Sequence, residues 1–468
     1  MALKRLRRSR VRTVGDLLEY FRAAEKPRRS WAVGIEAEKF GVLRESSKPI
    51  PYAGPRSVEA VLGYLARRFG WRPVLEDDEL MSLRRRESSI TLEPGGQIEL
   101  SGQPHRNLHD MCAEIHRHLN EMRAAGQEFQ IDWYGVGVHP TAALDDIAWI
   151  PKERYRLMRR FLPARGASGL HMMKRTCGIQ ASFDFDSEAD ATSKVRTAMA
   201  VAPVVSAIFA NAPISAGRLS RVVSERQRIW FDTDSSRCGM LEFVFSEDFG
   251  YRDYVEWALD VPIMLLQHNG RLVSPRGLTF RRFLSEGYQG QLATMDAWDL
   301  HLSSVFPDVR LRQTIEVRGA DAGNSLLCCA LPAIWKGVLY DRAALASAWD
   351  LVKSWSLEER RRVTREVALR GLQARVKKHR VLDVARELFR IAVASLRRQS
   401  GGAAVHGEGA VAARPGRGHV VGKNESIYLD PLRPFLFEWN ASPSEVFQRS
   451  WRKASGRERD TLVASLRY

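Results

Sequence analysis

Hydrophobic and polar residues alternate with a period of two in several parts of the chain, which is typical of strands with one buried face. Four such segments lie far apart: GIEAEKFG (34–41), LEPGGQIELS (92–101), RTCGIQASFDF (175–185) and QTIEVRGAD (313–321). Two longer stretches, 251–267 and 327–398, carry apolar residues at helical spacing. The strand-like and helical segments do not follow a regular βαβ order.

The segment 92–101 places a Pro-Gly-Gly sequence between two strand-like halves. If these three residues form a tight connection, Glu93 lies opposite Gln97 and Thr91 lies opposite Glu99. Glycine suits the positive φ angles that such a turn needs. If the chain instead continues through a bulge, the pairing is lost, but the same polar side chains still cluster on one face.

The other three segments show the same division between an apolar and a polar face. Glu36 and Glu38 share one face, Gln180 lies on the polar side of its segment, and Glu316 shares a face with Arg318. A solvated sheet face is polar without any chemistry in most proteins. The polar faces of four strand-like segments, however, offer side-chain oxygen atoms, which are the ligands that a hard cation such as Mg²⁺ prefers. Together with arginines they predict phosphoryl transfer from ATP.

Common nucleotide and nucleophile motifs are missing from the sequence. It has no GxxxxGK[ST] loop, no GxGxxG before a helix and no CxxC pair. No Ser-His-Asp or Cys-His signature appears either. ATP held by metal ions on a sheet is the kind of site that remains.

The balance of 72 Lys and Arg against 55 Asp and Glu gives a formal charge of +17, which raises the question of nucleic acid. The basic residues spread along the whole chain, and no zinc finger, RNP-type strand or basic zipper accompanies them. We therefore expect no nucleic-acid partner; anionic small molecules are a better explanation. No run of about 18 apolar residues occurs, so we expect no membrane span. The sequence does not indicate an oligomeric state.

The chain divides into four predicted parts. Residues 1–30 form a basic lead-in with a helix over 14–24, and their arginines also allow an organelle transit peptide. Residues 31–398 form the catalytic domain, 399–427 a flexible linker rich in Gly and Ala, and 428–468 a helical tail. The five cysteines show no disulfide or ligand spacing, which predicts a reduced, cytoplasmic protein.

An ordered series of motifs resembles the glutamate–cysteine ligases of the plant and alphaproteobacterial type, from about residue 14 to 395. That family carries G-T-E-x-E-K-F-G, here GIEAEKFG, and LEPGGQxELS, present intact at 92–101. In the family's order follow IPKERY (150–155), RTC (175–177), IWFDTDSSRCGM (229–240), YVEWALDVP (254–262), HLSSVFPDVRLR (301–312), IEVRGAD (315–321) and ALPAIWKGVLY (330–340).

The resemblance implies an α+β, glutamine-synthetase-like fold, in which a curved, largely antiparallel sheet with surrounding helices forms an active-site funnel. It also implies the first step of glutathione biosynthesis: ATP phosphorylates the γ-carboxylate of L-glutamate, and L-cysteine attacks the acyl phosphate to give γ-glutamylcysteine, ADP and phosphate. Mg²⁺ is the implied cofactor, and ATP, glutamate and cysteine are the substrates. The expected metal ligands are Glu36, Glu38, Glu93, Glu99 and Glu316; the catalytic arginines Arg318, Arg226 and Arg237; and the ATP-binding residues Arg318, Gln97 and Gln180.

Some positions depart from the family pattern around these residues. They are Ile35, Ala37, His171, Gly178, Ser182 and Phe231, the last in place of an arginine. Two alternatives therefore stay open: a related ligase that joins glutamate to a different amine, and a degenerate, non-catalytic binding protein. The second predicts damaged carboxylates, whereas all five are present.

Overall fold

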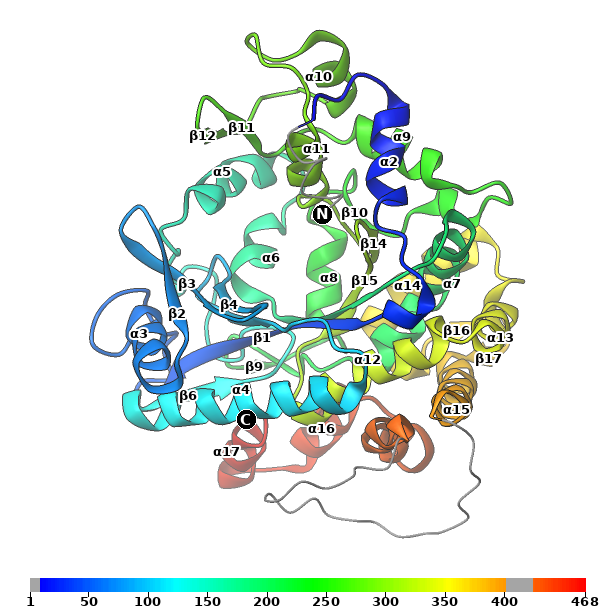
Figure 1. Cartoon of the computed structure of the whole chain (residues 1–468). Helices are drawn as coiled ribbons and strands as arrows, with labels where there is room; N and C mark the ends of the chain where they lie inside the picture. The colour runs from blue at the N-terminus through cyan, green and yellow to red at the C-terminus, as the bar shows by residue number, and fades with distance from the viewer. Residues whose placement is uncertain (1–8, 401–423) are drawn as a thin grey trace.

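A nine-stranded antiparallel sheet organises the molecule (Figure 1). The computed structural model describes residues 9–400 and 424–468. The strands run in the order β14-β15-β7-β1-β5-β4-β3-β2, and β6 pairs with the far end of β1. Their bounds are β1 (Val33–Leu43), β2 (Arg72–Glu76), β3 (Glu79–Arg85), β4 (Ser88–Leu92), β5 (Ile98–Ser101), β6 (Ile131–Tyr134), β7 (Gly178–Phe183), β14 (Val309–Leu311) and β15 (Ile315–Asp321).

Long helices cover the apolar face of the sheet. Ile35 and Ala37 of β1, Ile98 and Leu100 of β5 and Ile179 of β7 are all at most 4% exposed on that side. The covering helices are α3 (Val58–Phe69), α4 (Leu108–Phe129), α7 (Glu188–Ile208) and α12 (Ser325–Leu339), with α13 (Arg342–Val352), α14 (Leu357–Arg370) and α15 (Val381–Gln399) outside them. The alternation of strand residues thus sends the apolar set into this layer and the polar set to the other face.

Shorter helices stand on the polar side of the sheet, among them α5, α6, α8 and α11 in Figure 1. Their bounds are α5 (Glu153–Phe161), α6 (Gly169–Arg175), α8 (Glu225–Phe231), α9 (Tyr251–Asp260), α10 (Phe280–Glu286) and α11 (Met295–Leu302). Within the described ranges, no helix has the length and apolar character that a membrane crossing needs.

The β4–β5 connection confirms the predicted three-residue turn. The Glu93 N–H donates to the Gln97 carbonyl at 2.9 Å, and Thr91 pairs with Glu99. Gly96 has a φ of +82°, a conformation that glycine adopts without steric cost. At Gly95 a Cβ atom would lie 2.5 Å from the Lys174 carbonyl oxygen at the end of α6, so only glycine fits there.

Two predicted helices are shorter than the hydrophobic pattern suggested. The helix expected over 251–267 ends at Asp260, because Pro262 cannot continue it and disfavours helical backbone in the residue before it. The N-terminal helix α2 (Val14–Arg22) stops two residues before the predicted end. The long helical region splits into α12–α15, with a small β16–β17 hairpin (Arg375–Val376 and His379–Arg380) before α15.

The C-terminal segment packs against the helical layer. A 3₁₀ segment, η5 (Glu425–Leu432), contacts α12 and α15, and the Lys336 Nζ atom lies 2.5 Å from the Glu425 carboxylate. It is followed by α16 (Pro443–Lys453) and α17 (Gly456–Ala464), and the Tyr468 hydroxyl donates to the Gly323 carbonyl at 2.6 Å. Most of the predicted linker, 401–423, lies outside the described residues.

Leu100→Ala should lower the free energy of unfolding by about 2–5 kcal/mol, because Leu100 is 1% exposed in the middle of the apolar face and its loss leaves a cavity. Leu75→Ala is the control: Leu75 is 58% exposed on the edge strand β2, and we expect a change within about 0.5 kcal/mol. Urea unfolding curves measure both. Equal destabilisation by the two variants would contradict the assignment of the buried face.

Candidate functional site

The polar side of the sheet carries a cavity of about 310 Å³, which we call the carboxylate cavity. Polar side chains of β1, β5 and β7 and of the β4–β5 turn face it, and residues of α5, α6 and α8 complete the wall. Its charged residues are Glu36, Glu38, Glu93, Glu99, Lys152, Arg154, Arg226, Arg310 and Arg318. Negative and positive side chains therefore share one enclosure.

Strand register brings the carboxylates together. Glu38 lies directly opposite Glu99 across β1 and β5, and Glu36 lies opposite Gln180 across β1 and β7. Opposite residues of an antiparallel pair have Cβ atoms about 4.5–5.5 Å apart, close enough for like charges to destabilise each other. Glu99 accepts hydrogen bonds from the Thr91 hydroxyl at 2.8 Å and from a second hydroxyl, and Glu38 accepts from the Gly178 N–H at 2.7 Å.

The pKa values of four carboxyl groups in the cavity are raised above the ordinary value of glutamate: those of Glu36, Glu38, Glu93 and Glu99. Burial, followed by the charge of Glu99, raises the pKa of Glu36 to about 8; burial, followed by Glu93, raises the pKa of Glu99 to about 7. Burial and Glu93 also place the pKa of Glu38 well above its ordinary value. The pKa of Glu93 is raised by burial, although the nearby Arg154 opposes the shift. The cluster is thus short of positive charge, and a bound cation would stabilise its ionised form.

Glu316 differs from the other four glutamates in its partners, and its role as a metal ligand stays a prediction. Its carboxylate accepts from Arg310 Nε at 3.0 Å and Nη2 at 2.6 Å, and also pairs with Arg318. Burial alone would raise its pKa, but the two guanidinium groups outweigh burial and lower it to about 2. Glu316 does not line the cavity. In this arrangement both of its carboxylate oxygens accept from guanidinium groups.

A β-bulge aims Arg318 into the carboxylate cavity. The register of β15 against β7 shifts between Val317 and Ala320, and the extra length lets the Arg318 side chain leave the ladder. Its guanidinium donates to Gln180 and Glu316, while its carbonyl accepts from Arg226 Nη2 at 3.0 Å. The predicted residues Arg226, Gln180 and Arg318 therefore meet at one wall.

Two other predicted residues have internal partners. The Gln97 side chain accepts from the Gly95 N–H at 2.8 Å and donates to two main-chain carbonyls at 3.0 and 3.2 Å, so it braces the β4–β5 turn and is 1% exposed. Arg237 is fully buried outside the cavity, where its Nε donates to Asp234 at 2.7 Å and its other nitrogens donate to main-chain carbonyls. A substrate-binding role for Arg237 stays a prediction, and these internal contacts do not support it.

Sequence reasoning missed three basic residues of the cavity: Lys152, Arg154 and Arg310. Within the IPKERY motif, Lys152 directly precedes α5 and Arg154 lies in its first turn. Arg310 lies on β14 opposite Glu316. The alternation in VRLR, which turns Arg310 toward the polar face, was the available signal for the third. No periodic pattern marks a residue at the entrance of a helix, so Lys152 and Arg154 could be found only by their motif.

The donor chemistry of the cavity fits a hard divalent cation, since four carboxylates with raised pKa values face one space. Across residues 9–400 and 424–468, however, no three His, Cys, Asp or Glu side chains are arranged to hold one ion. The identity of the metal and its ligand set stay predictions.

Not all of the positions that depart from the family motifs lie beside the carboxylate cavity. Ala37 is 4% exposed and packs in the core behind the sheet, so it cannot contact a substrate in the cavity. Gly178, in contrast, lies against Arg226, because a Cβ atom there would be 2.7 Å from Arg226 Nη2. Phe231 lies at the end of α8 and is 41% exposed.

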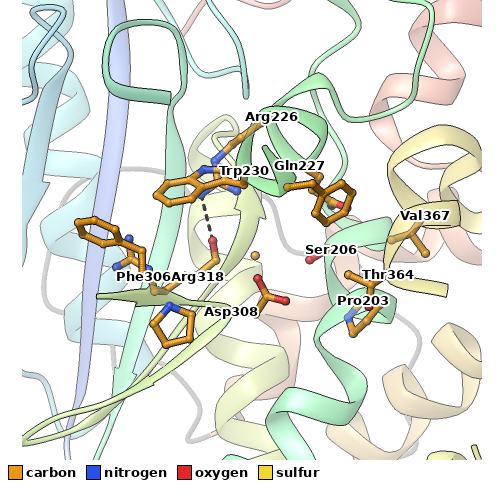
Figure 2. Close-up of a pocket in the computed structure, with 13 residues that line it drawn as sticks. Pro203, Ser206, Arg226, Gln227, Trp230, Phe306, Asp308, Arg318, Thr364 and Val367 are labelled. Atoms are coloured by element: carbon orange, nitrogen blue, oxygen red, sulfur yellow. Dashed lines mark hydrogen bonds between the residues drawn. The ribbon is translucent and has the colours of Figure 1, made fainter. Parts of the chain in front are cut away.

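A second, smaller cavity adjoins the first (Figure 2). Its volume is about 40 Å³, and it shares Arg226, Trp230, Phe306 and Arg318 with the carboxylate cavity. Asp308 stands on one side of it, with Gln227 of α8 across the space in Figure 2.

Comparison with protein families decides the class of the protein. Residues 32–416 match glutamate–cysteine ligase family 2, which is most of the chain. The chain belongs to this family. The match confirms the resemblance seen in the motifs, and it places the carboxylate cavity in a carboxylate–amine ligase.

Individual glutamate–cysteine ligases resemble this chain in sequence or in fold. Over 390 residues the chain is 41% identical to glutamate–cysteine ligase B, chloroplastic, of Oryza sativa subsp. japonica, covering 83% of this chain and 78% of the relative. The chloroplastic enzyme of Medicago truncatula is 40% identical over 83% of this chain and 76% of the relative. A glutamate–cysteine ligase structure from Francisella tularensis in complex with AMP superimposes with a TM-score of 0.54 at 14% identity, covering 92% and 86% of the two chains. That superposition confirms the predicted fold class.

The expected cytoplasmic location is contradicted by these comparisons. The plant relatives all carry chloroplastic names. The prediction rested on five cysteines without disulfide spacing, and such usage indicates only a reducing environment. It does not distinguish the cytosol from another reducing compartment.

Metal-free protein should become less stable as the pH rises from about 5 to 8. The folded pKa values of Glu36 and Glu99, about 8 and about 7, exceed the about 4.3 of a free glutamate. In this window the folded state binds more protons than the unfolded chain, so the free energy of unfolding falls with pH, by up to about 1.4 kcal/mol per pH unit for each group.

Urea unfolding in EDTA at pH 5, 6.5 and 8 measures this slope. Glu36→Gln should flatten it, and the exposed Glu358→Gln should leave it unchanged; the difference between variants removes the contribution of other titrating groups. A slope identical in Glu36→Gln and the parent protein would contradict the raised pKa of Glu36.

Proposed function

We propose that the protein ligates the γ-carboxylate of L-glutamate to the amine of L-cysteine with ATP, giving γ-glutamylcysteine, ADP and phosphate. The observation that carries the proposal is the meeting of four carboxylates with Lys152, Arg154, Arg226, Arg310 and Arg318 in one cavity. Carboxylates supply ligands for the divalent ions of a metal–nucleotide complex, and arginines supply bidentate donors for phosphoryl oxygens. Family membership supplies the reaction class.

Each group has a proposed task in that reaction. Glu36, Glu38, Glu93 and Glu99 would hold Mg²⁺, which would supply positive charge to the transferred phosphoryl group. Arg318 and Arg226 share one wall of the cavity and would stabilise the phosphoryl group as it leaves ATP, while Glu316 and Gln180 orient the Arg318 guanidinium. Because an acyl phosphate is already activated, positioning and charge stabilisation account for most of the rate enhancement.

Purified protein with ATP, Mg²⁺, glutamate and cysteine should form γ-glutamylcysteine, ADP and phosphate in equal amounts. With cysteine left out, the acyl phosphate should cyclise slowly, releasing 5-oxoproline and phosphate. Mass spectrometry and nucleotide chromatography follow both reactions. Release of AMP and pyrophosphate would contradict the phosphoryl-transfer mechanism.

A related ligase with a different amine is the second candidate, favoured by the change at Phe231 and by the place of Gly178 beside Arg226. A competition assay decides between the two candidates: cysteine and a panel of other amines share one pool of ATP and glutamate. We expect the largest kcat/KM for cysteine. A larger value for another amine would keep the ligase class and change the product.

Glu38→Gln and Glu316→Gln should fail in different ways. Glu38 faces the cavity, so its loss should raise the Mg²⁺ concentration for half-maximal rate by about tenfold or more, with partial recovery at high Mg²⁺. Glu316 holds arginines, so its loss should lower kcat with little change in the Mg²⁺ requirement. Magnesium titrations of the ATP-dependent rate, with Glu358→Gln as control, test this split. The same Mg²⁺ shift in both variants would restore Glu316 as a metal ligand.

A further inference from the structure

The residues that follow α17 lie beside β6 and are held there by main-chain and charged contacts. The Tyr468 N–H donates to the Trp133 carbonyl at 2.9 Å, and Arg467 pairs with Tyr134 as an antiparallel bridge. The Arg467 guanidinium also lies 3.1 Å from the Asp132 carboxylate. Three successive residues of β6 therefore fix the register of this part of the C-terminal segment.

The Tyr468 side chain turns inward from β6 and packs against apolar residues of the core. A Cβ atom at Gly135 would lie 2.6 Å from Cζ of Tyr468 and 2.5 Å from the Gly323 carbonyl oxygen, so only glycine at this position leaves room for the ring. The Tyr468 hydroxyl donates to that Gly323 carbonyl at 2.6 Å. Burial raises the pKa of Tyr468 well above its ordinary value, which keeps the hydroxyl protonated and able to donate.

The backbone that Tyr468 contacts leads into the carboxylate cavity. The residue before Gly323 is Ala322, whose N–H donates to the Cys177 carbonyl at 3.1 Å. The N–H of the residue after Cys177 donates to the Glu38 carboxylate at 2.7 Å. Glu38 faces the carboxylate cavity, so hydrogen bonds and a few backbone atoms connect the tyrosine to a proposed metal ligand.

A second route leads from the same backbone to α8. Asp321 directly precedes Ala322, is 1% exposed, and accepts from the Ser224 hydroxyl at 2.9 Å. Ser224 caps the N-terminus of α8, the helix that carries Arg226 and Trp230. Both of these residues line the carboxylate cavity. The end of β15 therefore supports two parts of the cavity wall at once.

We propose that Tyr468 is a positioning residue for the ligation reaction, because its ring and hydroxyl hold the end of β15 in the place from which Glu38 and α8 are aligned. Tyr468 is not among the residues that line the cavity, so it acts through these contacts and not on a substrate. A misplacement of about 1 Å at a reacting group can cost about 100-fold in rate, which makes such support important. The inference rests on the proposed ligase function and extends it to a segment outside the cavity.

Tyr468→Ala and Tyr468→Phe separate the ring from the hydroxyl. At a temperature where circular dichroism shows each variant folded, we expect Tyr468→Ala to lower kcat about tenfold and to raise the Mg²⁺ concentration for half-maximal rate about tenfold. Tyr468→Phe keeps the ring and should lie between the alanine variant and the parent protein. Trp439→Ala is the matched control: it removes an aromatic side chain that is 46% exposed in the same segment, and both values should stay at those of the parent.

Hydrogen exchange reads the same alignment without any turnover. Peptides covering residues 176–183 and 224–231 should exchange faster in Tyr468→Ala than in the parent protein, whereas Trp439→Ala should leave their exchange unchanged. Gly135→Ala provides an independent perturbation, because its added methyl group displaces the Tyr468 ring. It should reproduce both the kinetic and the exchange pattern of Tyr468→Ala.

A role in stability alone predicts a different result. In that case Tyr468→Ala would lower the melting temperature while the folded protein kept the parent kcat, Mg²⁺ requirement and exchange in both peptides, which would overturn the proposal. Equal effects in Trp439→Ala, or parent behaviour in Gly135→Ala, would also overturn it. A parent protein that forms no γ-glutamyl product would instead refute the proposed function, and the role of Tyr468 in the reaction with it.

Discussion

The clustering of four carboxylates on one face of an antiparallel sheet, inside one cavity, is the constraint on which the site depends. Glu36, Glu38, Glu93 and Glu99 are brought together by the register of β1, β4 and β5, and their pKa values rise because burial and like charge both disfavour ionisation. Like charges opposite each other on neighbouring strands destabilise a sheet, so this face does not stabilise the fold by itself. The arrangement becomes favourable only when cations enter, which is why the basic residues and a proposed metal–nucleotide complex belong to the same cavity.

Ion pairs with Glu316 position two arginines, Arg310 and Arg318, beside these carboxylates. Glu316 lies on the same sheet, yet it pairs with Arg310 and Arg318, and its pKa falls to about 2. The bulge in β15 then gives Arg318 two roles: its guanidinium faces the carboxylates, and its backbone contacts Arg226 and Asp308. One irregularity in one strand thus connects the carboxylate cavity, proposed for phosphoryl transfer, to the second, smaller cavity.

Alternation along the strands predicted the polar face of the site well, because a period of two fixes which side chains share a face. Glu93 opposite Gln97 and Thr91 opposite Glu99 are read directly from LEPGGQIELS. Alternation cannot say which polar groups are already paired, so Glu316 and Gln97 received ligand roles although arginines and main-chain groups engage them. It also says nothing of residues that enter from loops and helices, such as Lys152, Arg154 and Asp308. The end of α9 at Asp260 shows how a proline overrides an apolar pattern that continues past it.

The central claim is that phosphoryl transfer to the γ-carboxylate of glutamate occurs on this carboxylate face. Glutamate labelled with ¹⁸O in its γ-carboxylate tests it most directly, in a single ligation reaction followed by mass spectrometry of the products. The account predicts that one labelled oxygen passes to inorganic phosphate for each peptide bond formed, because the C–O bond to phosphate breaks when the amine attacks. Label recovered in AMP, or phosphate released without label, would contradict it.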